Sequence, residues 1–220
     1  SDSDVQEHAH RAQYTAGHVE GESVCGYQQE DNVPADSSTE TYAALKLYID
    51  NWRWQGVPFY LRTGKRLKKK QSMVSICFKK LPQTFFKDSG VNADARNWLI
   101  LGIQPDACLR LEMTVKEPGL QMHTRTASLD AGFLDEQESA TDAYEDLLLD
   151  VIEGDQSLFL RWDEVEWAWR VVEPILRAWS EDKAPLDTYE AGSWGAIKSR
   201  RLFDDQSFRW RHSIHSSSDD

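Results

Sequence analysis

The chain has 220 residues, of which 40% are hydrophobic and nine are tryptophan, and its formal net charge is −12. This length and apolar content exclude a disordered chain and suit one large folded domain or two small ones. The negative charge disfavours nonspecific binding to nucleic acid or to anionic membranes. No apolar run reaches the roughly 20 residues of a transmembrane helix, and no signal-peptide pattern opens the sequence. We therefore expect a cytoplasmic protein.

The three cysteines, Cys25, Cys77 and Cys108, are widely spaced and form no CxxC pair. We expect three reduced, partly buried thiols, as in a cytosolic protein. Three histidines lie close to the N-terminus, but no carboxylate or thiol spacing there supports a metal site. We expect residues 1–10 and 212–220 to be loose tails.

The clearest strand in the sequence is predicted from Ala107 to Val115, where apolar and polar residues alternate strictly. Its polar face contains Arg110, Glu112 and Thr114, and we expect that face to be wet. Turn residues separate it from the continuous apolar run Trp98–Ile103, so the two segments are expected to pair as a hairpin. A continuous apolar run is typical of a central strand covered on both faces.

Further strands are predicted by shorter stretches of alternation, and the N-terminal third also contains an irregular stretch rich in glycine. The expected strands cover residues 41–50, 59–61, 72–78 and, more weakly, 123–129, and the irregular entry segment covers residues 14–34.

The last third of the sequence changes to a helical period. Residues 142–145 fit a capping box for a helix that ends at Gly154, and residues 163–166 fit another for a helix running towards Trp179. Pro174 should kink that second helix or remove one hydrogen bond from it. The tryptophans at 162, 167, 169 and 179 are predicted to be core residues. Strands followed by helices predict an α+β fold, with a large, mostly antiparallel sheet and helices packed on one face.

Six cations gather within nine positions after the predicted strand 59–61, which is unusual in an acidic protein. They are Arg62, Lys65, Arg66, Lys68, Lys69 and Lys70. Gly64 permits a sharp turn that presents Lys65 to a cleft. An ammonium group suits a phosphate or sugar hydroxyls, and Lys70 lies within reach of the same ligand. The alternative is a solvated loop without function, because lysine runs usually face water.

The segment 36–67, DSSTETYAALKLYIDNWRWQGVPFYLRTGKRL, resembles the C-terminal domain of the glucose-6-phosphate dehydrogenase family. Further similar blocks follow in the family's order, and they are more specific together than any short motif. They are LILGIQP (99–105), AYEDLLLD (143–150), DEVE (163–166) and YEAGSWG (189–195). With an upstream RAQY (11–14), the resemblance covers roughly residues 11–210.

The resemblance implies substrate contacts and an oligomer interface for an enzyme that oxidises glucose 6-phosphate to 6-phosphogluconolactone with NADP, at the entry to the pentose phosphate pathway. In this family, the lysine of the RTGK motif and a basic residue five positions later contact the substrate. Those positions are Lys65 and Lys70 here. Gln104, in the IQP block, is implied as a further substrate contact. The resemblance also implies a homo-oligomer assembled through this domain.

The family's N-terminal dinucleotide-binding domain is not present in this chain, and the sequence has no GxGxxG motif. The family's catalytic histidine is missing with it. We therefore expect NADP to be bound mainly by that absent domain, and we expect this chain alone to be inactive, with neither a catalytic nor a metal-binding residue. Gly102, Arg110 and Glu112 differ from the residues of the structural NADP site in animal members. A stand-alone, non-catalytic sugar-phosphate-binding or scaffold module is the alternative, and an unrelated sugar-phosphate sensor is a third hypothesis.

Overall fold

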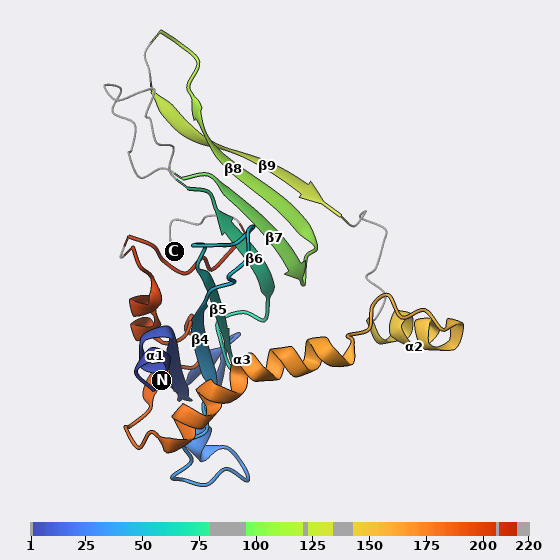
Figure 1. Ribbon diagram of the computed structural model, residues 1–220. Coiled ribbons are helices and arrows are strands. Elements are labelled where there is room, and N and C mark those ends of the chain that lie inside the picture. The colour runs from blue at the N-terminus through green and yellow to red at the C-terminus, as the bar shows by residue number, and fades with distance from the viewer. Residues whose placement is uncertain (1, 80–95, 121–122, 134–142, 206, 215–220) are drawn as a thin grey trace. The chain divides into compact units, whose positions relative to one another are not determined.

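The computed structural model describes residues 2–79, 96–120, 123–133, 143–205 and 207–214 (Figure 1). The chain divides into two compact units. The first consists of residues 1–69 and 147–210, and the second of residues 70–146 and 211–220.

The first unit is built on a four-stranded sheet of order β10-β1-β4-β5. The strands are β1 (Ala9–Thr15), β4 (Tyr42–Leu47), β5 (Phe59–Gly64) and β10 (Asp187–Glu190). Antiparallel pairing joins β1, β4 and β5, whereas β10 runs parallel to β1. The predicted strands 41–50 and 59–61 are confirmed as β4 and β5. No strand was predicted for β1 or β10, because their short sequences, AHRAQYT and DTYE, lack a run of β-branched and aromatic residues.

Segments that we expected to be loose or irregular contain short regular elements. Where we expected a loose N-terminal tail, the structure has α1 (Asp2–His8) and the start of β1. Part of the expected irregular segment forms the hairpin β2 (Gly17–Val19) and β3 (Glu22–Val24), followed by the 3-10 turn η1 (Tyr27–Gln29).

The core of the first unit consists of tyrosine rings and alanines. The rings of Tyr42 and Tyr189 lie 5.5 Å apart between centroids, and Tyr14 lies 6.3 Å from Tyr189. Ala12 and Ala44 are fully buried in the same cluster. A tyrosine core buries hydroxyl groups together with apolar rings, so each hydroxyl requires a hydrogen-bond partner.

The two predicted helices are present, and the second begins slightly earlier than predicted. α2 (Ala143–Glu153) ends at Gly154, which has a φ of 76°, as expected for a helix stop. Its predicted capping residue, Asp142, lies outside the described residues. α3 (Trp162–Glu181) begins earlier than predicted, because the amide of Arg161 donates to the Glu164 carboxylate at 2.8 Å. The 3-10 helix η2 (Ile197–Leu202) follows nearer the C-terminus.

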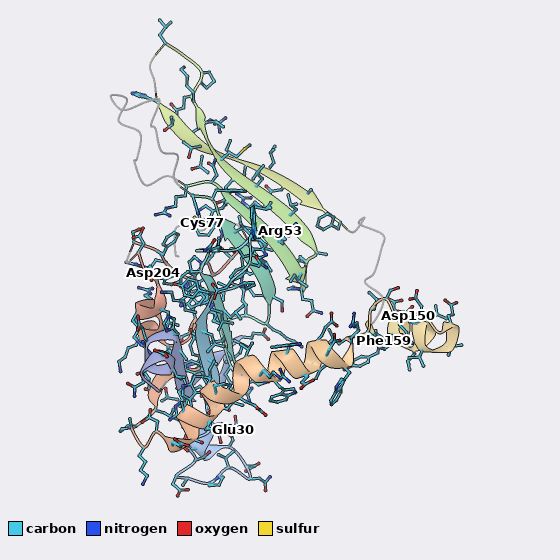
Figure 2. All side chains as sticks on the ribbon, viewed as in Figure 1. Glu30, Arg53, Cys77, Asp150, Phe159 and Asp204 are labelled. Carbon is cyan, nitrogen blue, oxygen red and sulfur yellow. The ribbon has the colours of Figure 1, made fainter. Side chains whose placement is uncertain are left out.

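The prediction that the α3 tryptophans are core residues is wrong for three of the four. Trp162, Trp167 and Trp169 are exposed by 80%, 63% and 55%, and no residue of α3 is fully buried. Side chains project from α3 along its length (Figure 2). Only Trp179 is half-buried, with the Arg11 guanidinium 5.8 Å from its ring centroid. Apolar periodicity indicates that one side of a helix packs against another element. Within the described parts of the chain, most of the apolar side of α3 is exposed instead.

The second unit contains a four-stranded antiparallel sheet whose strands follow chain order (Figure 1). The strands are β6 (Ser72–Cys77), β7 (Trp98–Gln104), β8 (Cys108–Lys116) and β9 (Thr124–Gly132). The predicted β7–β8 hairpin is confirmed, with Leu99 opposite Leu111. The α+β class with mostly antiparallel pairing is therefore confirmed, although the described strands form two four-stranded sheets and the small β2–β3 sheet where we expected one large sheet.

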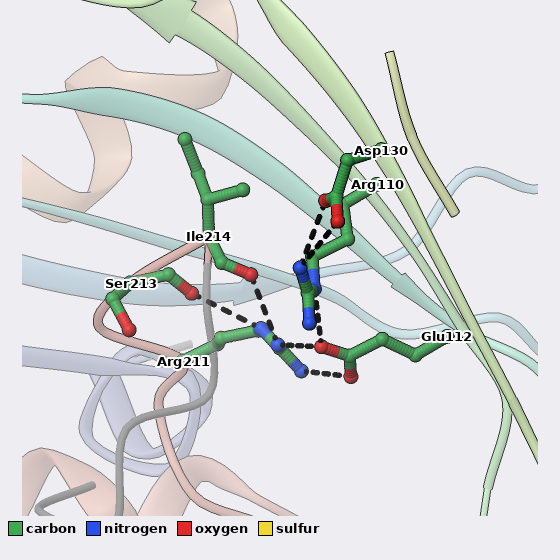
Figure 3. Close-up of polar contacts among 6 residues, drawn as sticks. All are labelled: Arg110, Glu112, Asp130, Arg211, Ser213 and Ile214. Carbon is green, nitrogen blue, oxygen red and sulfur yellow. Dashed lines mark hydrogen bonds and ion pairs between the residues drawn. The ribbon is translucent and has the colours of Figure 1, made fainter. Parts of the chain in front are cut away.

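The polar face of β8 is covered, contrary to our expectation that it would be wet. Glu112 is only 5% exposed, and Arg211 forms a bidentate ion pair with its carboxylate at 2.6 and 3.0 Å (Figure 3). Arg110 donates to the same carboxylate at 2.9 Å and to Asp130 on β9 at 2.8 Å. Arg211 also donates to the carbonyl oxygen of Ile214 at 3.2 Å. Buried charges are tolerated when they are paired in this way, so residues 211–214 are able to cover the polar face.

The apolar face of the same sheet is the more exposed one. Its most exposed side chains, between 40% and 61%, are Val74, Ile76, Phe78, Ile103 and Leu129. Alternation along β6, β7 and β9, together with the strand register, places them on the face opposite Glu112. A contiguous apolar surface of this kind on a folded unit is typical of an interaction surface. Separately, none of the helices within the described ranges has the length and apolar character needed to cross a membrane.

We predict that Glu112→Gln destabilises the protein by roughly 3–5 kcal/mol at pH 7, because it removes the buried negative charge that Arg110 and Arg211 share. Burial opposes ionisation of Glu112, but Arg211 and Arg110 outweigh it and lower the pKa of this carboxyl below its ordinary 4.5. The carboxylate therefore stabilises the folded state above that value and loses this contribution as the pH falls through the lowered pKa. Thermal denaturation across pH should show the gap between the two proteins narrowing below pH 4.5.

The matched control is Glu166→Gln, which removes an exposed ion pair with Arg170 on α3. Such pairs contribute about 0.5 kcal/mol or less, so this variant should melt close to the wild type. Equal effects of the two substitutions would contradict the role assigned to Glu112.

Candidate functional site

Lys65 is the first residue after β5, and its backbone is fixed on both sides. Its amide donates to the carbonyl oxygen of Thr41 at 2.8 Å, and its own carbonyl oxygen accepts the Tyr189 hydroxyl at 2.7 Å. The Lys65 side chain is exposed. The structure thus holds the main chain in place while leaving the ammonium group open to a ligand.

Gly64 has a different role from the one we predicted. The turn uses Arg66 in the left-handed region, with a φ of 51°, whereas Gly64 does not have a positive φ. A Cβ on Gly64 would lie 2.9 Å from Cδ2 of Tyr42 and 3.3 Å from the methyl groups of Leu67. Glycine is therefore required here by close packing against the tyrosine core, and not by the turn itself.

The loop that follows β10 holds the cationic turn from its other side. Gly192 donates its amide to the carbonyl oxygen of Arg66 at 2.8 Å, and the amide of Lys68 donates to Ser193 at 2.9 Å. Two segments more than 120 positions apart are joined by these main-chain bonds. The turn is consequently an ordered part of the first unit.

Three of the six clustered cations are engaged by the protein itself. Arg62 donates to the carbonyl oxygen of Trp194 at 3.2 Å, and the Lys68 ammonium lies 5.6 Å from the centroid of the Trp194 ring. Arg66 pairs with Glu30 at 3.2 Å. Lys68 therefore contacts an aromatic ring of the protein and is not merely a solvated charge.

Glu30 is held as a carboxylate beside the turn. The Tyr14 hydroxyl donates to Oε1 at 2.9 Å, and Arg66 donates to the same atom. These two donors, Tyr14 foremost, lower the pKa of Glu30. The ion pair commits Arg66 to a structural contact rather than to a ligand.

The remaining three cations, Lys65, Lys69 and Lys70, are exposed. Their ammonium groups have no hydrogen bond or ion pair to any residue that the structure describes. The available positive charge of the cluster is thus concentrated at these lysines, two of which the family resemblance assigns to the substrate.

Lys70 and Gln104 belong to the second unit, where they lie at the same end of the β6–β7 pair. Ser72, two residues after Lys70, is the register partner of Gln104, the last residue of β7. Both side chains are exposed. The antiparallel register therefore brings these two predicted site residues together, although they are 34 positions apart in the sequence.

A charged cavity of about 540 Å³ in the first unit is formed by α1, β1, the end of α3, β10 and η2, and Lys65 does not line it. Its charges satisfy one another: Asp187 accepts from His10 at 3.1 Å and from Lys198 at 2.7 Å. Burial is the main reason that the pKa of His10 is lowered from 6.5, so this ring is neutral near pH 7. The cluster of His10, Asp187 and Lys198 is therefore a structural contact, in which a neutral histidine links β1 to β10.

Within the described part of the chain, neither the cysteines nor the metal-ligating residues add a second candidate site. Cys25 is exposed, contrary to the prediction of a partly buried thiol, whereas Cys77 and Cys108 are half-buried. Among the residues that the structure describes, no group of three or more His, Cys, Asp or Glu side chains is placed to hold a metal ion.

Sequence reasoning did not identify Thr41 and Tyr189 as part of the site. Both are buried and lie behind the Lys65 main chain. Tyr189 belongs to the block YEAGSWG, so the block signalled a family resemblance without indicating what the tyrosine contacts. Its hydroxyl partners come from segments more than 120 positions away, and no local pattern reveals them.

Comparison with known proteins gives a consistent result. The family described as "Glucose-6-phosphate dehydrogenase, C-terminal domain" matches residues 1–211. A protein of Treponema pallidum named glucose-6-phosphate 1-dehydrogenase is 46% identical over 211 residues, covering 95% of this chain and 41% of its own length. The protein of the same name from Mycolicibacterium smegmatis is 45% identical over 201 residues, covering 90% of this chain and 40% of its own.

Solved structures match as well. The crystal structure of glucose-6-phosphate 1-dehydrogenase from Mycobacterium avium has a TM-score of 0.76 and 32% identity, covering 96% of this chain and 41% of that one. A glucose-6-phosphate dehydrogenase in complex with its substrate glucose 6-phosphate has a TM-score of 0.80 and 27% identity, covering 95% and 42%. The chain thus spans about two fifths of the length of the relatives that it matches.

Proposed function

Because this chain belongs to the family of glucose-6-phosphate dehydrogenase C-terminal domains, we propose that it supplies substrate contacts to an enzyme that oxidises glucose 6-phosphate to 6-phosphogluconolactone. The reaction removes a hydride from the sugar, with NADP as the acceptor, and requires a general base for the hydroxyl proton. In this proposal the domain binds and orients the sugar phosphate, while the base and the coenzyme site belong to the rest of the longer protein.

The observation that carries the proposal is the state of Lys65. Its main chain is anchored by Thr41 and Tyr189, its ammonium group is exposed, and no described residue pairs with it. A lysine held in this way offers three donors and a full charge to a phosphate or to sugar hydroxyls. Ordering the main chain beforehand reduces the entropy that would be lost when the ligand binds.

We extend the proposal to Lys70 and Gln104. Their common position at one end of the β6–β7 pair, with both side chains exposed, supports a shared role. An ammonium group and a carboxamide are complementary to a phosphate and to sugar hydroxyls respectively, because the amide both donates and accepts hydrogen bonds.

The residues that the structure describes do not form a site that fits the coenzyme. The sequence contains no GxGxxG motif. The described elements contain no glycine-rich strand–loop–helix unit of the kind that cradles a dinucleotide. In this proposal NADP is held by the rest of the longer protein.

The isolated chain is predicted not to reduce NADP when glucose 6-phosphate is supplied, since it offers neither a general base nor a coenzyme site. The measurement is absorbance at the NADPH wavelength across fractions of a sizing column. Turnover that follows the protein peak would contradict the division of labour proposed here.

In the full-length enzyme, Lys65→Ala should raise the KM for glucose 6-phosphate and lower kcat/KM by roughly ten- to a hundredfold. This range corresponds to the loss of one charge-assisted hydrogen bond of about 1.5–3 kcal/mol. The KM for NADP should change little, because the coenzyme binds elsewhere. Steady-state kinetics with each substrate varied in turn provides the measurement.

Lys69→Ala is the matched control for that substitution, since Lys69 is exposed, unpaired within the described residues and only four positions away. Its removal changes the local charge equally and should leave kcat/KM within about twofold. Similar, small effects of both substitutions would mean that the cluster is only a charged loop.

We also propose that the chain self-associates through the apolar face of the β6–β9 sheet. The five exposed residues of that face form a surface that water solvates poorly, and the opposite face is already covered by residues 211–214. A second copy of the chain, carrying the same face, provides a self-complementary cover in a symmetric dimer.

Sedimentation or light scattering in the micromolar range should detect the dimer, and Leu129→Lys should weaken it by tenfold or more, because a charge would be placed in the interface. Leu120→Lys is the control, since Leu120 is fully exposed but follows β8 outside the sheet. A monomer at every concentration, or equal effects of both variants, would refute this interface.

A further inference from the structure

A chain of buried hydrogen bonds ends at the main chain of Lys65. The amide of Tyr14 on β1 donates to Oγ1 of Thr41 at 2.9 Å, and that oxygen lies 3.1 Å from the Tyr189 hydroxyl. The Tyr189 hydroxyl lies 2.7 Å from the carbonyl oxygen of Lys65. The core strand β1 is thus connected to the proposed substrate lysine through two buried side chains.

The donors and acceptors of this chain can be assigned in one direction. Oγ1 of Thr41 already accepts the Tyr14 amide, so its own proton is available for the Tyr189 oxygen. The carbonyl oxygen of Thr41, 3.0 Å from the Tyr189 hydroxyl, already accepts the Lys65 amide. The carbonyl oxygen of Lys65 is nearer to the Tyr189 hydroxyl, at 2.7 Å, so the single Tyr189 proton is assigned to this acceptor. Burial raises the pKa of Tyr189 to about 12, so the hydroxyl keeps this proton at neutral pH.

We infer that Tyr189 is a positioning residue for substrate binding, and that its hydroxyl holds the Lys65 main chain where the ammonium group meets the sugar phosphate. The inference rests on the proposed function, because it assigns Tyr189 a role only through Lys65. Tyr189 does not touch the substrate, and its ring remains part of the tyrosine core.

The geometry of the turn explains why a single hydroxyl has this effect. Lys65 lies between Gly64, which is packed against the Tyr42 ring, and Arg66, which has a left-handed φ of 51°. Two hydrogen bonds, from Lys65 to Thr41 and from Tyr189 to Lys65, fix the peptide groups on either side of the Lys65 Cα. Losing the second frees the peptide that links Lys65 to Arg66, and a misplacement of about 1 Å is enough to cost up to a hundredfold in catalysis.

The test is Tyr189→Phe in the full-length enzyme, which retains the ring and removes only the hydroxyl. We expect kcat/KM for glucose 6-phosphate to fall about tenfold, through KM more than kcat, while the KM for NADP stays unchanged. The double variant Lys65→Ala/Tyr189→Phe should be no worse than Lys65→Ala alone, because the hydroxyl acts only through that lysine.

Tyr42→Phe is the matched control, because its hydroxyl is equally buried but donates to Oγ of Ser199 at 3.0 Å, away from Lys65. Both phenylalanine variants should lose similar thermal stability, and only Tyr189→Phe should lose affinity for the sugar phosphate. A silent Tyr189→Phe, a loss equal to that of Tyr42→Phe, or effects additive with Lys65→Ala would overturn the inference while leaving Lys65 as a substrate contact. A silent Lys65→Ala would overturn both the inference and the proposed function.

Discussion

The first unit depends on satisfying hydroxyl groups inside an aromatic core. Tyr14, Tyr42 and Tyr189 contribute rings that pack together, and every one of their hydroxyls has a partner: Glu30, Ser199 and the Lys65 main chain respectively. An unsatisfied hydroxyl in such a core would cost about 1–3 kcal/mol. The polar ends of the core therefore fix the surrounding segments in definite positions, and the cationic turn is one of those segments. The hydrogen bonds that stabilise the core of the first unit therefore also position the proposed site.

Much of this architecture was predictable from the sequence, because local patterns are sufficient for it. Alternation identified β4, β6 and β8, and the Gly154 stop identified the end of α2. The lysine assignments came from a motif resemblance rather than from periodicity. The support behind Lys65 was not predictable, since Tyr189 reaches it from 124 positions away and short strands such as β10 have no strong pattern of their own. Long-range hydrogen bonds leave no trace in a local window.

The sequence patterns also predicted which faces are apolar, but not what covers them. On β8 the expected arrangement was inverted: Glu112 and Arg110 are enclosed, while Leu129 on the neighbouring strand remains open. A charged side chain is buried only where an oppositely charged group pairs with it. The spacing of residues in the sequence did not indicate that Arg211 pairs with Glu112. The exposed tryptophans of α3 follow the same logic, because an apolar stripe specifies the need for a partner and not its identity.

The ion pair between Glu112 and Arg211 joins residues 99 positions apart, and this separation affects how the protein folds during synthesis. When β8 leaves the ribosome, the Glu112 carboxylate has Arg110 beside it. Its second partner, the Arg211 guanidinium, has not yet been synthesised. Translation proceeds at about 5–20 residues per second, so the nascent sheet remains incomplete for several seconds. The second unit therefore reaches its final packing only after nearly the whole of this sequence has been translated, whereas β1, β4 and β5 are able to pair much earlier.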